Sequence, residues 1–73
     1  MSSVSSSPDH LVQMVNDIAG FFAAEPDHEA AIAGIENHLR KFWDPRMRRK
    51  LIAYAQGGGA DIAPSARAAI ARL

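Results

Sequence analysis

A dense block of cationic and aromatic side chains lies in the middle of this 73-residue sequence. Residues 38–50, HLRKFWDPRMRRK, hold six of its eight Lys and Arg residues and its only Trp. Guanidinium and ammonium groups can pair with phosphates or with carboxylates, and Trp and Arg are enriched at interface hot spots. The block therefore indicates binding, either to a nucleic acid or to another protein.

Nucleic-acid binding is one interpretation of this block. Helical spacing places Arg46, Arg49 and Lys50 on one outward face, and such a face can neutralise phosphates. However, the chain has no net charge, and residues 1–36 carry six acidic residues without any Lys or Arg. That acidic half would repel phosphates. A small nucleic-acid-binding helical module that uses the basic face of residues 40–50 is kept as the alternative function.

Catalytic and metal-binding patterns are missing from the sequence. The three His residues are 18 and 10 positions apart, and the chain has no Cys to complete a zinc site. There is no Thr, and every Ser except Ser65 lies within the first seven residues. Gly57-Gly58-Gly59 lacks the Lys-Ser/Thr of a phosphate-binding loop and is typical of helix termination. We predict no catalytic, cofactor-binding or metal-binding residue, and no enzyme activity of the chain by itself.

Proline positions and apolar spacing predict the elements that must position the basic block. Ser7-Pro8-Asp9, Pro26-Asp27 and Asp44-Pro45 are typical helix starts. We expect an all-α fold, a small bundle of three helices with a short fourth C-terminal helix. The expected helices cover residues of about 8–24, 28–43, 45–56 and 64–72, in a single domain (8–73) that follows a disordered Ser-rich tail (1–7).

Two aromatic residues end the second of these helices. Phe42 continues an apolar stripe through Ile32, Ile35 and Leu39, so it is expected in the core. Trp43 falls at the edge of the stripe, and two interpretations remain open for it. It packs in the core beneath the Trp-Asp-Pro corner, or it is a half-exposed anchor among the neighbouring arginines.

The same residues resemble a known family. HLRKFWDPRMRRKLIAY (His38 to Tyr54), preceded by LVQMVNDIAGFFAAEPDHEAAIAGIENH, is similar to the delta subunit of NAD-dependent formate dehydrogenases, the soluble multi-subunit molybdenum or tungsten enzymes of bacteria. The similarity covers residues 9–73 and is most specific in H-x-R-K-F-W-D-P-R-M. It implies a non-catalytic accessory subunit that binds the large molybdopterin-containing alpha subunit, and through it beta and gamma, and supports its stability, assembly or activity.

The resemblance also implies what this chain lacks and where it binds. The host complex would carry molybdopterin guanine dinucleotide, iron–sulfur clusters, FMN and NAD, and this chain would bind none of them. No secretory signal and no membrane-length apolar run is present, so we expect a cytoplasmic chain without membrane contacts. Whether it stabilises the finished enzyme or acts as an assembly chaperone stays open. The predicted partner-binding residues surround the corner: Arg40, Lys41, Trp43, Asp44, Arg46, Arg48 and Arg49.

Overall fold

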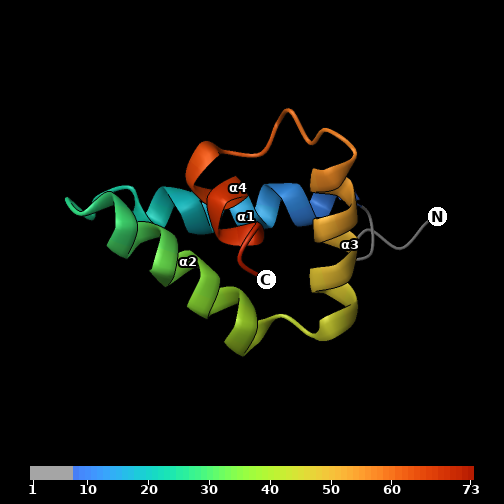
Figure 1. The fold of residues 1–73 in the computed structure, drawn as a ribbon, viewed down its shortest axis with the longest axis horizontal. Coiled ribbons are helices and arrows are strands. Elements are labelled where there is room, and N and C mark those ends of the chain that lie inside the picture. The colour runs from blue at the N-terminus through green and yellow to red at the C-terminus, as the bar shows by residue number, and fades with distance from the viewer. Residues whose placement is uncertain (1–7) are drawn as a thin grey trace.

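A computed structural model describes residues 8–73, which form four helices and, within that range, no strand. The helices are α1 (Pro8–Phe22), α2 (His28–Phe42), α3 (Pro45–Gln56) and α4 (Pro64–Ile70) (Figure 1). The predicted all-α fold class is confirmed. Relative to the expected bounds, α1 and α4 each end two residues earlier and α2 ends one residue earlier. The expected tail (1–7) lies outside the described residues.

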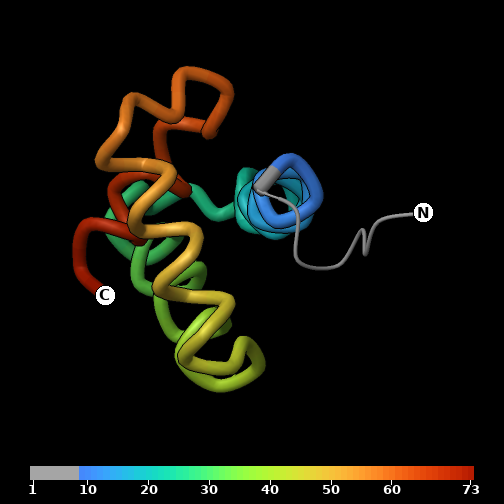
Figure 2. The backbone as a smooth tube through the Cα atoms, turned by 90° about the vertical axis from the view of Figure 1, so that its right-hand side faces the viewer, coloured from blue at the N-terminus to red at the C-terminus, as the bar shows by residue number. Residues whose placement is uncertain are grey.

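The helices form two layers around a single core. Figure 2 shows α1 end-on, packed against one face of a layer made by α2, α3 and α4. All four helices contribute wholly buried side chains, and the largest of these are Leu11, Val15, Ile35, Leu39 and Leu51. The other face of α1 is open to solvent, so that Phe21 is 78% exposed. α1 therefore packs against the other helices on one side only.

Acidic caps and prolines start the middle helices as the sequence predicts. The Asp27 carboxylate accepts a hydrogen bond from the Glu29 amide at 3.1 Å at the start of α2. The Asp44 carboxylate accepts one from the Met47 amide at 2.9 Å at the start of α3, with Pro45 in the first turn. Each carboxylate satisfies an amide that has no partner within its helix and also faces the positive end of the helix dipole.

Gly57 ends α3, and two glycines with positive φ follow it in the loop 57–63. Gly58 has φ +127° and Gly59 has φ +48°, backbone conformations that residues with a side chain rarely adopt. Gly59 is also buried, and a Cβ there would lie 2.9 Å from Ile62 Cδ1 and 3.1 Å from Ala55 Cα. The glycine run therefore terminates the helix, as predicted, and lets the loop pass close to its last turn.

Side chains from three helices hold this loop. Asn16 of α1 donates to the Asp61 carbonyl and accepts from the Ala63 amide, both at 2.9 Å. Tyr54 of α3 donates its hydroxyl hydrogen to the Asp61 carboxylate at 2.9 Å, which, with lesser contributions from desolvation and nearby carboxylates, raises the pKa of Tyr54 above 10.0. Arg67 of α4 donates to the carbonyls of Gly58 and Gly59. The loop thereby fixes α4 against the other helices.

Candidate partner-docking surface

The corner between α2 and α3 consists of only two residues, Trp43 and Asp44. Trp43 has an extended backbone (φ −96°, ψ 134°), and its amide still donates to the Leu39 carbonyl at 3.1 Å. Asp44 is also extended and caps α3. The extended backbone before Pro45 is required because a residue that precedes proline avoids helical angles. The chain therefore turns sharply and brings the end of α2 close to the start of α3.

The structure decides between the two interpretations of Trp43 and reverses the role expected for Phe42. Trp43 is only 4% exposed and belongs to the hydrophobic core, so its interpretation as a half-exposed anchor is wrong and the core interpretation is confirmed. Phe42 is 72% exposed, so its expected core position is also wrong. The last turn of α2 projects beyond α1 and α4 (Figure 1), which leaves Phe42 without neighbouring helices to cover it. The extended backbone at residue 43 instead turns the indole inward.

Phe42 is therefore an exposed aromatic residue within the basic block, and the sequence pattern missed its exposure. Its ring lies 4.8 Å, centroid to centroid, from the imidazole of His38, one helical turn earlier on α2. Aromatic side chains spaced by four positions pack on the helix surface in this way. The phenyl ring of Phe42 therefore faces solvent between the half-buried His38 and the exposed Lys41.

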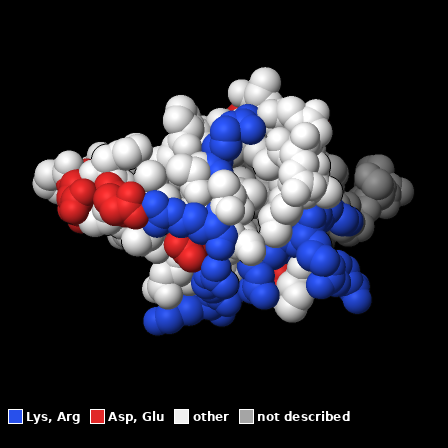
Figure 3. All heavy atoms as spheres, viewed as in Figure 1, with Lys and Arg blue, Asp and Glu red and all other residues white. Residues whose placement is uncertain are grey.

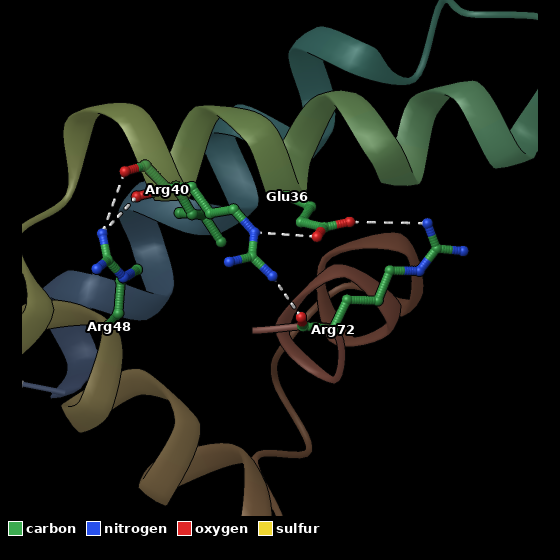
Figure 4. Close-up of polar contacts among 5 residues, drawn as sticks. Glu36, Arg40, Arg48 and Arg72 are labelled. Atoms are coloured by element: carbon green, nitrogen blue, oxygen red, sulfur yellow. Dashed lines mark hydrogen bonds and ion pairs between the residues drawn. The ribbon is translucent and has the colours of Figure 1, made fainter.

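Arg48 stabilises the corner from within. From α3 it reaches back to the end of α2 (Figure 4). There its Nη1 donates to the carbonyls of Leu39 (3.4 Å), Arg40 (3.2 Å) and Trp43. The last carbonyls of a helix have no partner within it and carry partial negative charge, so a cation there is stabilising. Arg48 was predicted to bind a partner, but its guanidinium hydrogens are directed at this chain's own backbone.

Arg40 also contacts its own chain. Its Nε donates to Glu36 at 3.0 Å and its Nη2 donates to the Arg72 carbonyl at 2.7 Å. Arg72 in turn pairs with Glu29 and lies 3.8 Å from Glu36 (Figure 4). These contacts attach the C-terminal residues to α2. Arg40 remains half exposed. Because its donors already contact this chain, it is a weaker candidate for partner binding than the sequence suggested.

The remaining predicted cations point outward. Lys41, Arg46 and Arg49 are exposed, and none of them pairs with a carboxylate in the described part of the chain. Figure 3 shows Lys and Arg side chains gathered over the end of α2 and over α3, with acidic side chains at the opposite end of the molecule. We call Lys41, Phe42, Arg46 and Arg49 the corner surface.

A groove of about 320 Å³ lies beside the corner surface, between α1 and α3. Leu11, Met14 and Met47 provide apolar side chains, while Arg46 and Lys50 bring positive charge to it, and His10 and Asp44 complete the lining. Met side chains adapt to irregular apolar partners. Asp44, one of the predicted binding residues, already accepts the Met47 amide and contributes to the fold as well as to this groove.

Two further observations concern the whole described range, residues 8–73. No three His, Asp or Glu side chains within it come together in a way that could hold a metal ion. None of its helices combines the length and apolar character needed to cross a membrane.

Comparison with known families identifies the family of this chain. The family model described as the NADH-dependent formate dehydrogenase delta subunit, FdsD, matches residues 10–70. The chain belongs to this delta-subunit family. The match includes all of α2, α3 and α4, the corner between α2 and α3, and all but the first two residues of α1. No curated protein and no solved structure gave a match to this chain.

Proposed function

We propose that this chain is a non-catalytic accessory subunit of a cytoplasmic NAD-dependent formate dehydrogenase, and that it binds the large alpha subunit through the corner surface. The observation that carries the proposal is the family match over residues 10–70, which includes the outward-facing cations around an exposed Phe. The chain binds no cofactor itself. Molybdopterin guanine dinucleotide, iron–sulfur clusters, FMN and NAD belong to the other subunits of the complex.

The chemistry of docking follows from the corner surface. Phe42 is 72% exposed and can fill an apolar depression in the partner. Lys41, Arg46 and Arg49 can meet carboxylates around that depression, and Arg is suited to bidentate pairing. The rigid two-residue corner, capped by Asp44 and Arg48, presents these groups at little cost in conformational entropy.

Binding of this kind stabilises the alpha subunit by mass action. A protein that binds only the folded form of its partner shifts the folding equilibrium toward that form. The same contact supports the finished enzyme or the folding of alpha before its cofactor is inserted. Delta present in stoichiometric amount in purified holoenzyme favours the structural role, whereas delta found only with cofactor-free alpha favours the chaperone role.

A charge-neutralised variant tests the corner surface. Arg46→Gln with Arg49→Gln removes two positive charges, and the control Ala23→Glu with Ala24→Glu lowers net charge equally at two exposed positions after α1. Affinity for the co-expressed, purified alpha subunit should fall by about tenfold or more in the first variant and by less than about twofold in the control. Equal affinities of both variants and the wild-type chain would remove the corner surface from the proposal.

Nucleic-acid binding predicts a different pattern for the same variant. Retention of the wild-type chain on a DNA column at low salt, lost steeply as salt rises and lost in Arg46→Gln with Arg49→Gln, would support the alternative function. An accessory subunit instead passes through the DNA column and is retained by immobilised alpha subunit.

A further inference from the structure

A second, larger groove lies between α3 and α4, and none of the residues that line it belongs to the corner surface. It has a volume of about 500 Å³ and is lined by residues of both helices and of the C-terminus: Ile52, Ala55, Gln56, Arg67, Ile70, Ala71 and Leu73. Apart from the polar groups of Gln56 and Arg67, these side chains are aliphatic, and none of them is acidic. The groove is open to solvent rather than enclosed.

Positive charge borders this apolar floor. Arg67 lines the groove, and its guanidinium is held by the carbonyls of Gly58 and Gly59, so within the described residues no carboxylate neutralises it. Arg49 lies one helical turn before Ile52 on α3 and is exposed. Figure 3 shows Lys and Arg side chains bordering a largely uncharged surface over α3 and α4.

We propose that this groove is the binding site for an amphipathic helix of the large subunit. That helix has an apolar stripe flanked by Asp or Glu. This inference rests on the proposed function and adds a second contact to it. A groove between two helices with an aliphatic floor is the usual receptor for a helix that inserts side chains spaced by three and four positions. The charge of Arg67 and Arg49 selects acidic flanks on that helix.

Other occupants fit the groove less well. A phosphate-rich ligand would gain nothing from the aliphatic floor that makes up most of the lining. A small polar ligand would find few polar groups to orient it, because Gln56 and Arg67 are the only polar side chains of the lining. An acidic, apolar helix uses both the floor and the charge.

Two acidic substitutions with a matched control test the groove. Ala71→Glu places a carboxylate in the lining, and Gln56→Glu does so with almost no change of shape. Ala53→Glu adds the same charge to an exposed position of α3 that does not line the groove. Emission of the buried Trp43 and far-ultraviolet circular dichroism report whether each variant is folded.

The proposal predicts that Ala71→Glu weakens binding to purified alpha subunit by about tenfold and Gln56→Glu by a smaller factor, with Ala53→Glu close to wild type. A photoreactive side chain at position 71 should crosslink to one alpha-subunit segment with acidic residues around an apolar helical stripe. Binding by folded Ala71→Glu and Gln56→Glu variants that equals that of Ala53→Glu overturns the groove proposal, as does a crosslink to a second copy of this chain. In that case the loss seen for Arg46→Gln with Arg49→Gln still supports the corner surface. A wild-type chain that fails to bind alpha overturns both proposals.

Discussion

The two connections that flank α3 are built in similar ways but leave different surfaces. At the corner, Arg48 of α3 reaches back to the carbonyls that end α2, and in the loop 57–63 Arg67 of α4 reaches back to carbonyls that follow α3. Each connection therefore uses one arginine to satisfy backbone groups. Only the corner has additional cations, Lys41, Arg46 and Arg49, that face solvent. The proposed docking surface is therefore supported by the cations that the fold does not use, rather than by the total number of cations.

The largest expected effect separates the two aromatic residues of the corner. Trp43→Ala removes a core side chain and should lower the free energy of unfolding by about 3–5 kcal/mol, enough to unfold a domain this small. Phe42→Ala removes a side chain that is 72% exposed and should change stability by no more than about 0.5 kcal/mol. Urea unfolding followed by circular dichroism measures both. Equal destabilisation would show that Phe42 is covered in solution.

The next effect separates the arginines of the corner. Arg48→Met keeps much of the side-chain volume but leaves the carbonyls at the end of α2 without their charged donor, and should cost about 1–2 kcal/mol. Arg49→Met should leave stability within about 0.5 kcal/mol, because no described residue pairs with it. The same urea experiment decides between them. A stability loss in Arg49→Met that matches Arg48→Met would contradict this division.

Glycines test the other connection. Gly59→Ala forces a side chain into a left-handed conformation and against Ile62, and should destabilise the protein by about 1–2 kcal/mol. Gly20→Ala lies inside α1 with nothing near the new methyl group and should stabilise it by up to about 1 kcal/mol. Thermal unfolding of the pair should give midpoints that shift in opposite directions. A neutral Gly59→Ala would mean that the loop relaxes freely.

The smallest effect concerns pH. The hydrogen bond to Asp61 favours the protonated phenol of Tyr54 and raises its pKa above 10.0, so the stabilisation is present below that pH and is lost as pH rises through the folded-state pKa. Because this is the only Tyr, its phenolate absorbance can be titrated directly. Asp61→Asn should move the midpoint back toward 10.0. An unchanged midpoint would show that the hydrogen bond is absent in solution.

Local signals in the sequence predicted most of the fold but not the exposure of the corner residues. Prolines next to Asp residues predict where the middle helices begin. Asp44 forms its predicted cap, and Asp27, expected in the first turn of its helix, caps that helix instead. Phe42 was misassigned and Trp43 was left undecided, because a helical wheel assumes that neighbouring helices cover its whole length and that the helix continues past residue 42. Neither assumption holds at the corner, because α2 ends at Phe42 and its last turn extends past α1 and α4.

Contacts between residues that are distant in the sequence could not be predicted from sequence patterns either. Asn16 holds a loop that is 45 residues away in the chain, and nothing around Asn16 distinguishes it from a surface amide. Likewise, spacing placed Arg40 and Arg48 in the basic cluster but could not show that their donors are directed at this chain's own carboxylate and carbonyl oxygens. Which cations are available to a partner depends on tertiary structure.

The most direct test of the account is the affinity of Phe42→Ala for the purified alpha subunit, measured beside its urea midpoint. Because the exposed phenyl ring is proposed as the apolar anchor of the corner surface, affinity should fall by about tenfold or more while the midpoint stays at the wild-type value. Wild-type affinity in the folded variant would contradict docking through the corner surface.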